Sequence, residues 1–316
     1  MITFAFIAFY MALCYFNQLM VTIALAFIQS FPGILSSGSL FLPTMARLIV
    51  DSMDQRIGVI LAVSAILSLL MYIFIWRLRK RDFISQCKLN RFSSVKDICM
   101  GTLLGFSANF VISLILVILT MIPLFSHTFA EYQQFISILS AKNLIPAFIG
   151  IGFLGPIMEE ILFRGMISAE LSELFSFPTV LILQGIIFGV YHGNVVQAAY
   201  AAILGFLFGY CSYKSNSLYP AIAAHIAMNS TSLLLTLPSV TTQLSKLSVT
   251  LVYFLASSIA FVCSFQYFLQ KRSPHGPLSV DSVDLIDSED SISSAASVDA
   301  VDFISSGNPA SPNNEH

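Results

Sequence analysis

The feature that most constrains this chain is the length of its stretches without a charged residue. One runs from Met1 to Ala46 and another from Leu174 to Tyr213, and others cover residues 57–76, 98–130, 215–245 and 247–270. A helix of about 20 apolar residues crosses the hydrocarbon core of a bilayer. Only 10% of the 316 residues are charged, against about 25% in soluble domains. The pattern excludes an ordinary soluble protein, a nucleic-acid binder and a disordered chain, and indicates a polytopic membrane protein.

Turn residues and charges divide the chain into about eight apolar segments, each of a length that suits a helix. The sequence therefore predicts an all-α, polytopic membrane helical bundle with about eight transmembrane helices. The expected helices cover roughly residues 3–28, 57–76, 98–124, 144–168, 179–193, 196–213, 217–237 and 248–270.

Charge also separates the chain into parts. Residues 273–316 carry eight acidic residues and no Lys or Arg, and they are rich in Ser, Ala and Asn. Too little apolar content remains there to form a core. We expect a disordered acidic tail at 273–316, an intramembrane core at 97–272, and two further transmembrane helices with a basic loop at 1–96.

The basic residues predict the orientation in the membrane. Seven of them lie between residues 77 and 96, and Lys214, Lys271 and Arg272 fall on the same side if eight helices alternate. The opposite side receives Arg47, Arg56, Lys142 and Lys246. Because basic loops stay in the cytoplasm, we expect both termini there. No feature indicates an endoplasmic reticulum, so the cell (inner) membrane is the favoured location.

Ionisable residues inside apolar helices are costly, and they are functional candidates for that reason. Three segments contain them. Glu160 and Arg164 are four apart in the fourth expected helix, so they share a face and can pair, whereas Glu159 is turned by about 100°. The other two segments hold His192, and His225 with Asn229 four residues later.

These residue types can activate water. Desolvation raises the pKa of a carboxylate enough for it to act as a general base near neutral pH, and histidine and amide groups can stabilise an oxyanion. Glu159, His192 and His225 could equally hold a divalent zinc ion and leave one position for water. The cofactor is therefore either a metal or none. Both versions predict hydrolysis of a peptide bond inside the membrane.

The three segments together resemble the CAAX-protease and bacteriocin-processing family of intramembrane proteases, also called the Abi family. The matching motifs are Glu159-Glu160-x-x-x-Arg164, Phe188-x-x-x-His192 and His225-x-x-x-Asn229. The resemblance covers roughly residues 97–238. It implies that Glu159 activates the attacking water with help from His192, and that His225 and Asn229 form the oxyanion side. Glu160 and Arg164 would be a supporting pair.

Two other classes of function fit the same residues. The polar core could serve a non-enzymatic membrane scaffold or immunity-type protein, or Glu159 and the histidines could relay protons in a coupled transporter. The expected partners are a protein or peptide substrate in or at the membrane and the lipid bilayer, with no nucleic acid. Gly185, Gly189, Gly205 and Gly209 are expected to allow close helix packing rather than to bind a ligand.

Overall fold

The computed structural model describes residues 2–37, 41–139, 143–244 and 246–272, and for residues 30–37, 41–55, 135 and 137–139 it describes the backbone only. The expected acidic tail at 273–316 lies outside the described residues, as do the side chains of Arg47 and Lys142. Every regular element among these residues is a helix. The predicted all-α helical bundle is therefore confirmed.

Eight of the helical stretches correspond to the eight expected ones. They are α1 (Ile2–Ser37), α2 (Phe41–Leu78), α4 (Val95–Thr120), the composite helix Leu144–Ser172, α9 (Phe177–Tyr191), α10 (Val195–Ser215), α11 (Tyr219–Leu235) and α13 (Leu247–Gln270). The composite helix consists of α6 (Leu144–Ala147), η2 (Phe148–Leu154), α7 (Gly155–Glu160), η3 (Ile161–Ile167) and α8 (Ser168–Ser172). Four short helices were not expected: α3 (Phe83–Gln86), η1 (Pro123–Phe125), α5 (Ser126–Leu139) and α12 (Pro238–Leu244).

The eight stretches do not all have the length of a membrane span. Six helices among the described residues are long and apolar enough, and α11 with α12 makes a seventh if the pair, bent by 87°, is one broken span. Helix α9 has 15 residues, which is about 22 Å at 1.5 Å per residue and less than the roughly 30 Å of hydrocarbon. The expected count of eight full spans is thus reduced to six or seven. The protein is a multi-pass integral membrane protein.

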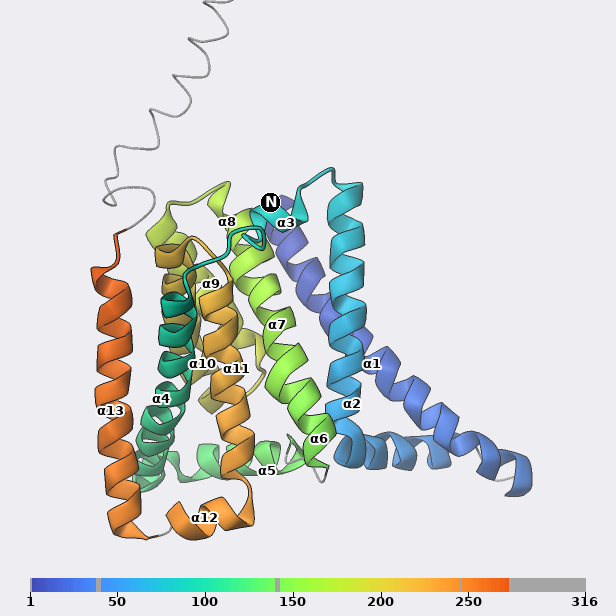
Figure 1. The fold of residues 1–316 in the computed structure, drawn as a ribbon. Coiled ribbons are helices and arrows are strands. Elements are labelled where there is room, and N and C mark those ends of the chain that lie inside the picture. Colours follow the sequence, from blue (N-terminus) through green and yellow to red (C-terminus); the bar gives the residue numbers. More distant parts are fainter. Residues whose placement is uncertain (1, 38–40, 140–142, 245, 273–316) are drawn as a thin grey trace, which may run out of the picture. The chain divides into compact units, whose positions relative to one another are not determined.

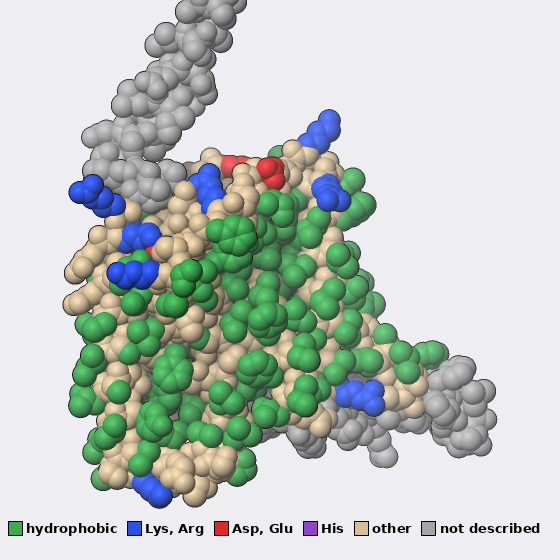
Figure 2. Space-filling model, viewed as in Figure 1, with side chains coloured by type: hydrophobic (Ala, Val, Ile, Leu, Met, Phe, Trp, Pro, Cys, Tyr) green, Lys and Arg blue, Asp and Glu red, His purple; other side chains and the backbone are tan. Residues whose placement is uncertain are grey.

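Charge is segregated along the bundle axis. In Figure 2, Lys and Arg side chains gather at the end of the helices that carries α3 and α8, while the middle of this face is almost wholly apolar. A buried carboxylate fixes this end. Glu170 accepts from Arg81 at 2.8 Å and also from Arg79 and from the hydroxyl of Tyr10. This network ties α1 and the loop after α2 to α8.

Glycines set the closest helix contacts. A Cβ at Gly105 of α4 would lie 1.8 Å from the carbonyl oxygen of Ala224 in α11, and one at Gly205 of α10 would lie 2.7 Å from the Cα of Gly185 in α9. Only glycine allows the backbones to approach so closely. The expected packing role of the glycines of α9 and α10 is confirmed.

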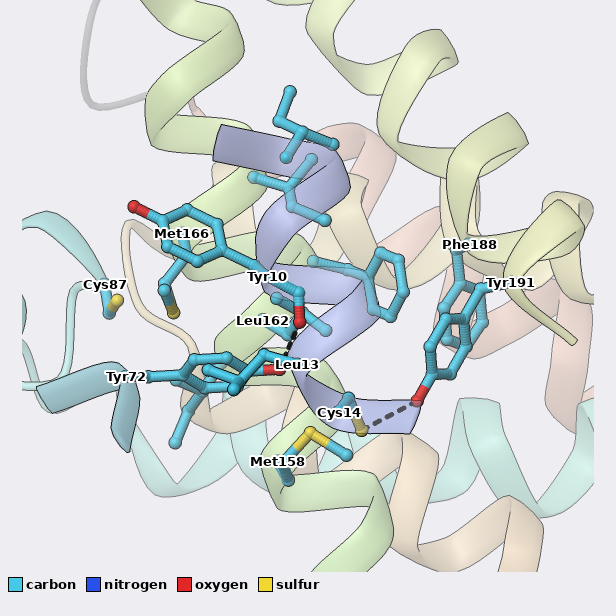
Figure 3. Close-up of a cluster of buried hydrophobic side chains, with 14 of the residues drawn as sticks. Tyr10, Leu13, Cys14, Tyr72, Cys87, Met158, Leu162, Met166, Phe188 and Tyr191 are labelled. Carbon is cyan, nitrogen blue, oxygen red and sulfur yellow. Dashed lines mark hydrogen bonds between the residues drawn. The ribbon is translucent and has the colours of Figure 1, made fainter. Parts of the chain in front are cut away.

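The largest buried cluster lies where α1 and α2 meet the composite helix. Tyr10 and Cys14 of α1 lie among Tyr72, Met158 and other apolar side chains (Figure 3). The hydroxyl of Tyr72 donates to the carbonyl of Tyr10 at 2.9 Å. The Cys14 sulfur lies 3.0 Å from the hydroxyl of Tyr191, at the end of α9. Helices α1 and α2 are therefore packed directly against the helices that carry the candidate site.

The glycine contacts lead to a stability test. Gly105→Ala should lower the free energy of unfolding by about 2 kcal/mol or more, because its Cβ would meet backbone atoms that cannot move aside. Gly152→Ala is the matched control, since its Cβ would meet only side-chain atoms, the nearest at 3.2 Å. Thermal unfolding of the purified protein in detergent measures both. Equal losses would show that the α4–α11 contact is not limited by Gly105.

Candidate active site

The two glutamates of the first motif lie in a short α-helical segment between two wider helical turns. Helix α7 contains Glu159 and Glu160, and π-helices precede it (η2) and follow it (η3). Such π-helical turns are rare and frequently occur at functional sites. Here they rotate the two glutamates relative to the rest of the composite helix.

Pro156 explains the first of these turns. In η2 the backbone N–H of Gly155 donates to the carbonyl of Gly150, five residues earlier. Proline has no N–H, so position 156 supplies no donor, neither to the carbonyl of Gly152 four residues earlier nor, in the π-helical register of η2, to that of Ile151 five residues earlier. Asn229 donates to the carbonyl of Ile151 at 3.0 Å and Ser230 to that of Gly152 at 3.3 Å. Two polar side chains of α11 thus hold α11 and the composite helix together close to the glutamates.

Glu160 is the centre of a buried polar cluster. Its side chain is wholly buried, and one of its oxygens accepts from Arg164 Nη1 at 2.8 Å and from His225 Nδ1 at 2.8 Å. The Arg164 guanidinium also lies 4.2 Å from the centre of the Phe188 ring. The first motif, Phe188 of the second motif and His225 of the third therefore meet in one cluster.

Glu159 points to a different space from Glu160. Its side chain is 19% exposed, and its carboxylate lies 3.7 Å from Nε2 of His225. One imidazole thus faces both glutamates, with Nδ1 bonded to Glu160 and Nε2 towards Glu159. The bond to Glu160 fixes the ring orientation, which leaves Nε2 for the cavity.

His192 lies at the end of α9, where the chain turns into α10. Its Nδ1 donates to the carbonyl of Phe188 at 2.8 Å, and the following Gly193 has a positive φ of 70°. Asn194 then begins α10 by accepting from the backbone N–H groups of Val196 and Gln197. This turn fixes the ring of His192 and leaves its Nε2 as the free acceptor.

A cavity of about 380 Å³ brings these groups together, a volume in the range of small-ligand sites. Glu159, His192, His225 and Asn229 all line it, whereas Glu160 and Arg164 do not. The structure therefore brings all six predicted residues together and separates them into four that face a cavity and two that lie behind it. Which of them are catalytic stays a prediction.

The cavity also has a wall that sequence reasoning missed. Tyr15 and Gln18 of α1 line it, as do Ile57, Leu61 and Ser64 of α2. The hydroxyl of Tyr15 donates to the carbonyl of Tyr191, next to His192. Uncharged residues at single polar positions in the first two helices gave no motif, so only the packing shows that they face the site.

The residues do not fit a zinc ion as they are arranged. Among the described residues no three His, Cys, Asp or Glu side chains lie close enough together to hold a metal ion. His225 already uses one ring nitrogen for Glu160. The alternative in which Glu159, His192 and His225 form a metal centre therefore receives no support from this geometry.

One comparison with known proteins covers the segment that carries these residues. Residues 141–231 match the family model of the Rce1-like type II CAAX prenyl endopeptidases. The resemblance to the CAAX-protease family is thereby confirmed. A curated bacterial relative, "Putative membrane peptidase YdiL" of Bacillus subtilis (strain 168), is 29% identical over 100 residues, which are 31% of this chain and 41% of the relative. No solved structure gives a significant match. The chain thus aligns with about two fifths of the length of this relative.

The role of Asn229 can be tested through Pro156. Asn229→Leu leaves the carbonyl of Ile151 without a donor, which should cost about 1–3 kcal/mol of unfolding free energy. Pro156→Ala returns an N–H to the helix, so the double variant should lose clearly less than Asn229→Leu alone. A double-mutant cycle by thermal unfolding in detergent measures the coupling. Additive losses would mean that Asn229 does not stabilise the helix by replacing the donor that proline lacks.

Proposed function

We propose that the protein is an intramembrane endopeptidase that hydrolyses peptide bonds with a water molecule activated by Glu159. The observation that carries the proposal is the common cavity of Glu159, His192, His225 and Asn229, within helices that match a membrane peptidase family. Its walls away from these groups are largely apolar, with Ile57, Leu61 and other aliphatic side chains. The proposed substrate is therefore a peptide segment in or at the membrane. Prenylation of that substrate is not part of the proposal.

The proposed reaction follows from the positions of the side chains. Glu159 takes a proton from a water molecule held with the help of His192 Nε2, and the water oxygen attacks the carbonyl carbon of the peptide bond. The carbonyl oxygen becomes an oxyanion, to which doubly protonated His225 donates from Nε2 and Asn229 donates its remaining amide N–H. When the C–N bond breaks, Glu159 returns the proton to the leaving amine. The products are a carboxylic acid and an amine, and transfer of the acid proton to the amine gives a carboxylate and an ammonium group.

Glu160 and Arg164 have a positioning role in this proposal. Glu160 orients His225 from outside the cavity, and Arg164 neutralises the Glu160 charge. In a low-dielectric site an unpaired carboxylate would be costly. The pair therefore allows a histidine to be held beside Glu159 without a second free negative charge.

The end of the helices that carries the basic loop is proposed to face the cytoplasm, with both termini on that side. Ten Lys and Arg residues belong to this end, from Arg77 to Lys96 and at Lys214, Lys271 and Arg272. The favoured location is the cell (inner) membrane.

Glu159→Gln tests the activity. The substitution keeps size and removes the base, so peptide cleavage should fall by about 10²–10⁴-fold. The measurement compares new peptide termini in membranes that express the wild type or the variant at equal abundance. Glu131→Gln is the control, because Glu131 is 64% exposed and does not line the cavity. No difference between the wild type and Glu159→Gln would support the scaffold or the transporter instead.

A chelator tests the mechanism. If Glu159 acts without a metal, 1,10-phenanthroline should leave the cleavage of the peptides identified above unchanged at concentrations that strip zinc from metalloproteases. Loss of cleavage that returns on addition of zinc would contradict the proposed mechanism, while leaving the protease activity itself in place. The same cleavage assay, with purified protein in detergent, gives the readout.

A further inference from the structure

The carbonyl group directly before His192 has no backbone donor. It belongs to Tyr191, the last residue of α9. In a continuing helix the N–H of residue 195 would donate to it, but the chain turns at Gly193 with a positive φ. Among the described residues, no backbone N–H outside the helices donates to this carbonyl. Helix ends leave such carbonyls to be satisfied by other groups, so a group from outside the turn has to hold this one.

Helix α1 supplies the donor. It begins at the end of the bundle that carries α3 and α8 (Figure 1), and Tyr15 lies midway along its membrane span, Ile2–Gln29. The hydroxyl of Tyr15 donates to the carbonyl of Tyr191, and the centres of the two rings are 4.9 Å apart. An unsatisfied carbonyl is costly at this depth of a membrane protein. The bond from Tyr15 therefore stabilises the end of α9.

The preceding residue of α1 holds the other end of Tyr191. The sulfur of Cys14 lies 3.0 Å from the Tyr191 hydroxyl, a contact drawn in Figure 3. The ring of Phe163, in the composite helix, packs edge to face against the Tyr191 ring with the centres 5.1 Å apart. Two consecutive residues of α1 therefore fix both the backbone and the side-chain tip of the residue that precedes His192.

The imidazole of His192 is attached to the same turn. The backbone N–H of His192 donates to the carbonyl of Gly189 at 3.1 Å, and its ring Nδ1 donates to that of Phe188 at 2.8 Å. Both acceptors belong to the last turn of α9, so the ring moves with this turn. The position of His192 Nε2 relative to Glu159, on the composite helix, therefore depends on the groups that hold the turn, and Tyr15 is one of them.

We propose that Tyr15 is a positioning residue for the proposed hydrolysis. Its bond to the Tyr191 carbonyl holds the last turn of α9, so that Nε2 of His192 faces the water molecule that Glu159 activates. Tyr15 acts through His192 and takes no part in the proton transfers. The inference rests on the proposed function for its chemistry, but the contact can be measured without any cleavage. Because Tyr15 lies outside the matched segment 141–231, the motifs of that segment depend on a helix that the match does not cover.

Tyr15→Phe tests the contact in the full-length protein, purified in detergent. The substitution keeps the ring and removes the hydroxyl. Hydrogen exchange, measured by mass spectrometry, should become about tenfold faster at the amides of His192 and Gly193, because the turn opens more easily without the bond.

Tyr72→Phe is the matched control for hydrogen exchange. Its hydroxyl also donates to a carbonyl of another helix, that of Tyr10 in α1, and Tyr72 does not line the cavity. Faster exchange at the turn in Tyr15→Phe alone would support the contact. Unchanged exchange in Tyr15→Phe, or equal acceleration at this turn in both variants, would overturn the proposal.

The second arm measures cleavage of the peptide that gives the most abundant new terminus in the wild-type membranes. Tyr15→Phe should lower kcat about tenfold and leave KM unchanged, since the ring still lines the cavity. In a His192→Ala background the same substitution should cause no further loss, because Tyr15 acts through His192. A further loss of full size in that background, or a change in KM alone, would contradict the positioning role.

The two arms separate this inference from the proposed function. If the wild type cleaves no peptide, the proposed function is wrong and the positioning role falls with it, while hydrogen exchange still shows whether Tyr15 holds the turn. If the wild type cleaves the peptide and Tyr15→Phe has the same kcat and KM, the positioning role alone is wrong.

Discussion

A carboxylate with no access to water, Glu160, is the group on which the rest of the candidate site depends. Burying an ion in a low-dielectric interior costs several kcal/mol unless it is paired and hydrogen-bonded. Arg164 supplies the charge from one turn further along the same helix, and His225 supplies a second donor from α11. The first contact is local and the second joins two helices. Both reach the same oxygen, Oε1 of Glu160, and the bond to this oxygen fixes the position of His225 relative to Glu159.

The same rule applies to the backbone. A carbonyl without a donor is expensive in a membrane, where no water can replace it. Pro156 leaves the carbonyls of Ile151 and Gly152 without a backbone donor directly before the glutamates, and α11 supplies a side-chain donor to each, from Asn229 and Ser230. The proline is tolerated in this helix because α11 packs beside it, with Asn229 and Ser230 next to the two carbonyls. Asn229 of the third motif thus has a structural contact in addition to its place beside His225 in the cavity lining.

Much of this arrangement could be predicted from the sequence. The spacing of Glu160 and Arg164 predicted their ion pair, and the charge-free stretches predicted the helices. Both features depend on residues that are close together along the chain. Helix α9 was expected at 179–193 and lies at Phe177–Tyr191, with the same 15 residues. The error was to count a helix of this length as a full membrane span, since it covers only about 22 Å. The π-helical turns were not predicted. Pro156 is visible in the sequence, but the donors from α11 that satisfy the carbonyls before it are not. The Glu170 network and the place of Tyr15 and Gln18 in the cavity wall were not predicted either, because they depend on contacts between helices that are far apart in the sequence.

Tyr15 and Gln18 lie outside the segment that matches the family model. The matched segment, 141–231, contains every group that the proposed chemistry uses. The facing wall of the cavity comes from α1 and α2, which precede that segment in the chain. Catalytic groups act on the peptide bond, which is the same in every substrate, whereas the facing wall meets the side chains, which differ. If the chain cleaves peptides, its reaction should therefore resemble that of the family, while its choice of substrate should depend in large part on residues that the resemblance does not cover.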